Sequence, residues 1–79
     1  MKDAKMEVYQ KQNRRWVLMT ESADQDYISR WMADKLVSRY LVQYSEDRVT
    51  TDYFAYKETT CRTTFDHRNG WKTVIYYNR

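Results

Sequence analysis

One cysteine and one histidine, Cys61 and His67, are the residues in this chain best suited to nucleophilic chemistry, and Asp66 precedes the histidine. A thiol activated by an imidazole requires both side chains to meet in a shielded pocket. Here the histidine falls in an expected turn, and the cysteine falls in a threonine-rich expected strand. We interpret His67 as a solvent-facing turn residue and Cys61 as a small packed side chain, and we expect no enzyme activity.

Metal and cofactor sites also find little support in the composition. A single Cys and a single His exclude a zinc site built from the usual ligands, and one Gly cannot supply a glycine-rich phosphate loop. The carboxylates of turns and strand edges have no telling spacing and are interpreted as solvated charges: Glu46, Asp47, Asp52, Glu58 and Asp66. We expect no metal, no cofactor and, because no apolar run could span a bilayer, a cytoplasmic protein without membrane contact.

Aromatic residues are the most informative part of the composition. The 79 residues include three Trp, eight Tyr and two Phe. A domain of this size has a small interior, so several rings must lie at the surface, where Tyr and Trp are typical of contact sites. These residues predict a non-catalytic protein that binds another protein. Small chains without an enzyme signature are often inhibitors or accessory proteins of phages and mobile elements, and we expect a role of that kind.

Basic residues favour an alternative function, the binding of nucleic acid. The net charge is +3, and residues 9–19 contain three cations and no acid. Both expected turns, Asn13–Arg15 and His67–Lys72, are basic and adjoin Tyr9, Trp16 and Trp71. Sheets bind single strands through stacked aromatics and phosphate-binding arginines. The chain has no Gly-Phe ribonucleoprotein motif, GXXG loop or helix-turn-helix, so protein binding remains our first hypothesis.

The elements that must position these residues follow from patterning and turn signals. Residues 6–12 and 15–20 predict a hairpin around the polar turn Asn13-Arg14. Ser22 to Gln25 has the form of a capping box, which predicts a helix over about residues 23–39. The remaining sequence predicts strands over 40–44, 48–57, 59–65 and 71–77, the last two joined at Asn69-Gly70.

The expected fold is therefore a single α+β domain over residues 1–79. It has the order ββα followed by a three- to four-stranded antiparallel meander, with one helix packed on one face of the sheet. A helix about 10–12 Å wide covers two or three strands spaced about 4.8 Å apart. Either the sheet curls so that both faces are internal, or a partner or a second copy covers the second face.

The helix presents one apolar arc that is expected to face the core, formed by Ile28, Met32, Ala33, Leu36 and Tyr40. Tyr27 and Trp31 fall beside this arc, where they either widen the buried stripe or form an exposed anchor for a partner. The expected contact surface combines aromatic residues with charged residues at the rim: Tyr27, Trp31, Tyr53, Trp71 and Tyr76, with Arg14, Arg15 and Arg68. Self-association through the same surface is compatible with this hypothesis.

Overall fold

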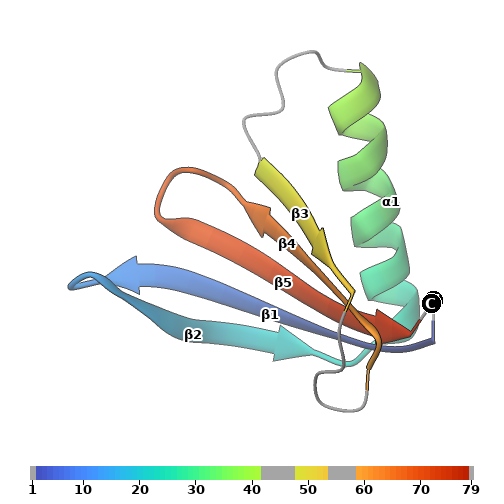
Figure 1. The fold of residues 1–79 in the computed structure, drawn as a ribbon, viewed down its shortest axis with the longest axis horizontal. Coiled ribbons are helices and arrows are strands. Elements are labelled where there is room, and N and C mark those ends of the chain that lie inside the picture. The colour runs from blue at the N-terminus through green and yellow to red at the C-terminus, as the bar shows by residue number, and fades with distance from the viewer. Residues whose placement is uncertain (1, 42–47, 54–58, 79) are drawn as a thin grey trace.

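The computed structural model describes residues 2–41, 48–53 and 59–78, with the side chains of Lys2 and residues 36–41 outside that description. The elements in chain order are β1 (Lys2–Gln12), β2 (Arg15–Ser22), α1 (Gln25–Leu41), β3 (Arg48–Asp52), β4 (Cys61–Asp66) and β5 (Trp71–Asn78). Five antiparallel strands form one sheet, and α1 lies against one of its faces (Figure 1). The α+β class predicted from the sequence is confirmed.

The strand order is β2-β1-β5-β4-β3, so the first and last long strands pair at the centre of the sheet. This order makes β2 and β3 the two edges among the described strands. It also places the β1–β2 turn and the β4–β5 turn at the same end of the sheet (Figure 1). The Lys11 N–H donates to the Gly70 carbonyl at 2.7 Å and ties these two turns together.

The β1–β2 hairpin is confirmed, and its two-residue turn has left-handed backbone at both positions. Asn13 has φ 50° and Arg14 has φ 66°. Two left-handed residues give the turn whose twist matches that of the flanking strands, and Gly is favoured at the second position. Arginine there is strained, because a Cβ in this region approaches the following carbonyl oxygen.

Replacement of Arg14 by glycine is therefore expected to stabilise the fold by about 1 kcal/mol, since the strain disappears at a position that glycine adopts freely. The measurement is the free energy of unfolding from urea titration. Arg15→Gly is the matched control, because Arg15 begins β2 and does not have a positive φ. The control is expected to lose about 0.5–1 kcal/mol, and equal responses of the two variants would contradict the strain at Arg14.

The β4–β5 turn lies where the sequence predicts it, but its left-handed residues are Arg68 (φ 61°) and Gly70 (φ 86°) rather than Asn69 and Gly70. Asn69 instead accepts the Trp71 N–H with its side-chain Oδ1 at 3.2 Å, and Asp66 Oδ1 accepts the Arg68 N–H at 2.9 Å. Asn and Asp side chains commonly accept such backbone N–H groups two residues further on, in place of a backbone carbonyl. A second arginine is thereby held in left-handed backbone, in the other turn at this end of the sheet.

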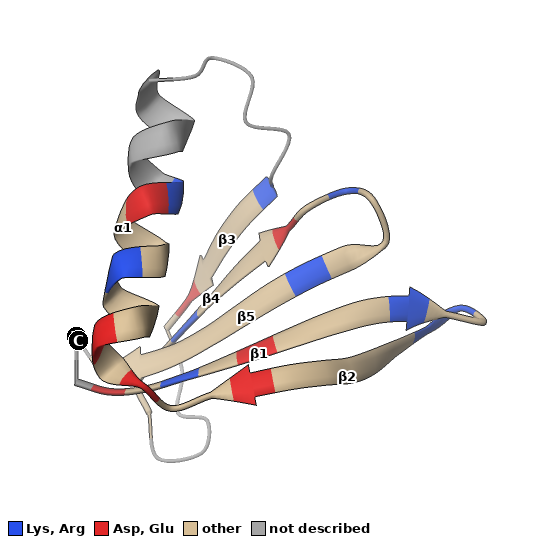
Figure 2. Ribbon diagram, turned by 180° about the vertical axis from the view of Figure 1, so that it is seen from behind, with Lys and Arg blue, Asp and Glu red and all other residues tan. Residues whose placement is uncertain are grey.

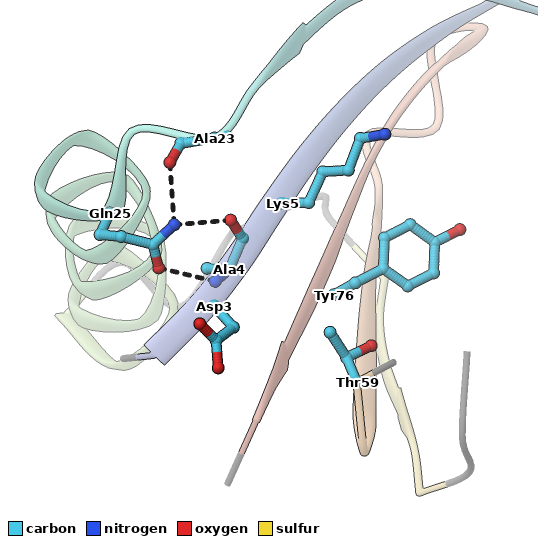
Figure 3. A pocket seen from close by; sticks show the side chains of 7 residues that line it. All are labelled: Asp3, Ala4, Lys5, Ala23, Gln25, Thr59 and Tyr76. Carbon is cyan, nitrogen blue, oxygen red and sulfur yellow. Dashed lines mark hydrogen bonds between the residues drawn. The ribbon is translucent and has the colours of Figure 1, made fainter. Parts of the chain in front are cut away.

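The start of α1 differs from the expected capping box. The helix begins at Gln25, and Asp24 caps it by accepting the Tyr27 N–H at 3.1 Å. Gln25 does not reach back to the cap. Its amide accepts the Ala4 N–H at 2.6 Å and donates to the Ala4 carbonyl at 2.8 Å (Figure 3). Gln25, which the local pattern assigned to the cap, therefore bonds to the backbone of β1 instead.

The helix also continues further than predicted, to Leu41. The expectation of a strand from residue 40 is wrong for Tyr40 and Leu41, while residues 42–44 lie outside the described residues. Each added residue of a nucleated helix gains one hydrogen bond, and neither Gly nor Pro occurs in this region to end it. The predicted strand over 48–57 is described only as β3, because residues 54–58 also lie outside the described part.

A buried cluster joins the helix to the central strands, with Ala4, Met6, Ile28, Met32, Phe65 and Ile75 as its members. Trp31 packs edge-on against Phe65, with ring centroids 5.0 Å apart and planes at 89°. Ala33 was expected in the same helical arc and is exposed, because one residue beyond Met32 turns about 100° away from the sheet. The side chains of Leu36 and Tyr40 lie outside the description. In the described part of the chain, no helix is long and apolar enough to cross a membrane.

Candidate functional site

The two turns and the strand ends beside them form a basic surface, which we call the hairpin end and define as residues 9–19 and 66–73. These ranges contain five Lys and Arg residues and one acid, Asp66. Figure 2 shows Lys and Arg at both turns, with one acidic segment at the end of β4 and the others on α1, β1, β3 and the end of β2. The pairing of β1 with β5 brings the cations together, although they are more than 50 residues apart in the chain.

Two of these cations contact aromatic rings on the face of the sheet opposite α1, which we call the helix-free face. Lys72 Nζ lies 4.5 Å from the Trp16 ring centroid and 5.1 Å from that of Tyr9, and Lys11 Nζ lies 5.6 Å from that of Trp16. Burial lowers the pKa of Lys72, and the nearby Arg62 guanidinium lowers it further, whereas Asp66 opposes the shift. Each cation–aromatic contact of this kind contributes about 0.5–1 kcal/mol at an exposed site.

The most unusual surface of the hairpin end is an apolar run on β2. Trp16, Val17, Leu18 and Met19 have exposed fractions of 38%, 37%, 45% and 45%. Runs of three or four consecutive exposed apolar residues are unusual unless they serve a function. Because β2 is an edge strand, its outer backbone groups are also available for pairing. This run, Trp16–Met19, is called the β2 apolar run below.

A bulge interrupts the pairing of β2 with β1 inside this run. Tyr9 is opposite Leu18 and Val8 is opposite Thr20, so Met19 has no partner residue on β1. The bulge changes which side of the sheet later residues face. Arg15, opposite Gln12, is on the side of α1, whereas Glu21, opposite Glu7, is on the helix-free face.

A groove of about 530 Å³ lies on the α1 side of the hairpin end. It is lined by Val8, Trp31, Lys35, His67, Asn69, Trp71 and Thr73. Lys35 Nζ lies 5.6 Å from the Trp31 ring centroid, and His67 Nε2 lies 2.9 Å from Thr73 Oγ1. The groove and the β2 apolar run therefore offer aromatic and basic groups on both sides of one end of the sheet.

The residues expected to form the contact surface divide into three groups. Arg14, Arg15, Arg68 and Trp71 lie at the hairpin end, and Trp31 shares the groove with Trp71. Tyr27, with 46% exposed, lies on the outer side of α1 beside Arg30 and Asp34. Tyr53, which is 63% exposed, follows Asp52 at the end of β3 that lies away from the hairpin end.

Tyr76 does not fit the expected surface, because only 5% of it is exposed. It lies on the helix-free face together with Val74 and Glu7, which are also buried although no helix of the described residues covers that face. Long neighbouring side chains flank them, as at Lys5 and Arg62, the residues opposite Tyr76. The helix-free face is thus closed at its centre and exposes aromatic and apolar groups at the β2 edge.

Sequence reasoning did not include the β2 apolar run among the site residues. Its apolar character and alternating orientation were visible in the sequence. The missing information was the strand order, because the same four residues in a central strand would be buried on both sides.

Cys61 and His67 do not form a nucleophilic pair. Cys61 is buried at one end of β4, opposite Tyr77, and the ring of His67, beyond the other end, contacts Trp31 at a centroid distance of 6.3 Å. Six residues of extended chain separate them by about 20 Å. Cys61 is packed as predicted, but His67 is half-buried rather than solvent-facing. Within the described residues, no group of three or more Cys, His, Asp or Glu is placed to hold a metal ion.

The fold and this surface together define a small α+β protein with a five-stranded antiparallel sheet and an exposed apolar edge. No protein-family model, curated protein or solved structure matches the chain.

Proposed function

We propose that this protein is non-catalytic and acts by binding another protein through its hairpin end, as an inhibitor or accessory protein would. One observation carries the proposal: the β2 apolar run is exposed over four consecutive residues of an edge strand. Covering apolar surface releases about 25 cal/mol per Å², and only an apolar partner surface provides that cover. Trp16 has the size and shape of a typical interface anchor, with cations around it as a rim.

Substitution of Leu18 by glutamate tests this proposal. Leu18 is exposed, so the variant is expected to fold, but a buried unpaired carboxylate should weaken a protein contact at least tenfold. The measurement is quantitative affinity capture from a nuclease-treated lysate of the native host, comparing wild type and variant. Thr50→Glu is the matched control, because Thr50 is exposed on the same face at the opposite edge. Equal capture by both variants would remove β2 from the contact surface.

Nucleic-acid binding is the second candidate function, and the clustering of cations and rings at the hairpin end favours it. Lys11 and Lys72 lie beside Tyr9 and Trp16, which is an arrangement suited to phosphates and stacked bases. However, Lys72 already lies against both rings. A phosphate group also makes no favourable contact with the exposed Val17, Leu18 and Met19 side chains, so this function would leave them unexplained. A gel shift whose affinity falls steeply with salt would favour this function over protein binding.

A further inference from the structure

The free edge of β2 has a defined set of backbone groups that face outward. The Lys11 N–H bonds to Gly70 on the β5 side, so the adjacent residues of β1, Gln10 and Gln12, direct their groups toward β2. Their partners Val17 and Arg15 therefore face β1, which leaves Trp16 and Leu18 with outward N–H and C=O groups. The bulge at Met19 ends this regular stretch. The free edge of β2 can therefore pair with a short strand only.

The charges beside this edge select the chemistry of the strand that covers it. No acid occurs between Glu7 and Glu21, whereas Lys11, Arg14 and Arg15 lie in that interval. Arg14 and Arg68 are both exposed and both held in left-handed backbone, where glycine would be less strained. Backbone strain at exposed positions is often kept for a functional side chain. Arg14 and the neighbouring Arg15, at the start of β2, are suited to carboxylates.

A second copy of this chain fits the edge poorly. Antiparallel pairing across the bulge would oppose Arg15 with Glu21 of the other copy, but these side chains are on opposite faces of the sheet. Pairing confined to Arg15–Leu18 would leave the cations of both hairpin ends without acidic partners. Charge complementarity therefore favours a different, acidic chain.

We infer that β2 adds one short antiparallel strand from an acidic partner protein, with apolar residues over the β2 apolar run and carboxylates beside Arg14 and Arg15. This inference rests on the proposed function and specifies its partner. Main-chain hydrogen bonds to Trp16 and Leu18 supply affinity, and the apolar and acidic side chains supply specificity. Antiparallel pairing places the carboxylates at the C-terminal end of the added strand.

The test uses a fluorescein-labelled probe peptide, acetyl-Thr-Val-Thr-Ile-Thr-Val-Glu-Asp-amide, in a polarisation titration against the full chain. Replacement of Glu-Asp by Lys-Lys and N-methylation of three central residues are each expected to weaken binding about tenfold. On the protein, Leu18→Pro removes an outward N–H while leaving the bonds to β1, and is expected to weaken binding about fivefold relative to Leu18→Ala. Since Leu18→Pro is at risk of misfolding, the N-methylated peptide tests the same hydrogen bonds with the native chain.

The variant Arg14→Gly separates charge from structure, because it removes a cation beside the edge of β2 at a strained position. It is expected to be more stable than the native chain and yet to bind the probe about fivefold more weakly. Unchanged affinity would overturn the role of Arg14. Equal binding of the N-methylated and unmodified peptides would overturn strand addition.

Three further outcomes would overturn the inference in distinguishable ways. If light scattering shows a dimer that Leu18→Pro disrupts, a second copy covers the edge. If a 20-nucleotide oligothymidine competes with the probe and binds more tightly, the hairpin end is a nucleic-acid site. If Leu18→Glu loses its captured partner while no peptide binds, the proposed function survives and strand addition does not.

Discussion

Replacement of Phe65 by alanine is expected to lower the free energy of unfolding by about 3–5 kcal/mol. Phe65 is 1% exposed, lies in the cluster with Ile28 and Ile75, and supports Trp31 through an edge contact. Truncation to alanine leaves a cavity in the buried cluster and also removes the edge contact with the Trp31 ring. A chain of this length has a total stability of about 4–12 kcal/mol, so the variant should be partly unfolded in mild urea.

Urea titration followed by circular dichroism measures this effect. Phe65→Leu is the conservative control and should lose much less, because it keeps most of the buried volume. Leu18→Ala should change stability by less than about 0.5 kcal/mol, since Leu18 is exposed on the edge strand. A loss below about 1 kcal/mol in Phe65→Ala would contradict the core described here.

Replacement of Gln25 by methionine is expected to cost about 2–3 kcal/mol, the second largest effect on stability. The Gln25 amide makes two hydrogen bonds to the backbone of Ala4, at 2.6 and 2.8 Å (Figure 3). Ala4 is 2% exposed and lies where the register of β1 with β5 is irregular. Methionine keeps the size and the helix propensity but leaves both backbone groups without these partners.

Gln12→Met is the matched control, because Gln12 is an exposed glutamine of the hairpin end and is expected to change stability by less than about 0.5 kcal/mol. Amide hydrogen exchange at Ala4 gives an independent measurement, and protection there should fall in Gln25→Met. A pocket of about 490 Å³ adjoins this contact, so water can replace part of the lost bonding. Unchanged stability together with unchanged exchange would show that Gln25 does not fasten β1 to the helix.

The function proposed for the hairpin end opposes the stability of the fold. Arg14 and Arg68 occupy positions where glycine is favoured, and the β2 apolar run is exposed to water. Each feature costs folding free energy, and each suits the binding of an acidic, partly apolar chain. Such local disagreement between residue type and conformation is most common at functional sites.

Local interactions were the part of this fold that the sequence predicted well. The Asn13-Arg14 hairpin, the presence of the helix and the α+β class follow from contacts between near neighbours in the chain, for which residue type is a sufficient guide. The capping box failed because Asp24 competes with Ser22 for the same role and Gln25 has a stronger partner in Ala4. The strand expected from Tyr40 failed because a helix continues where no residue stops it.

The amino-acid sequence by itself determined that this chain carries more aromatic and basic surface than a small domain needs, at Tyr9, Trp16, Trp71 and the two turns. Only the tertiary structure decided that β1 pairs with β5, which gathers the cations of both turns at one end and leaves β2 at the edge. Strand order depends on contacts between residues far apart in the chain, and every strand here has a pattern that would also suit other neighbours. The same pairing decided that Tyr76 is buried and that Leu18 is exposed, which no local pattern distinguishes.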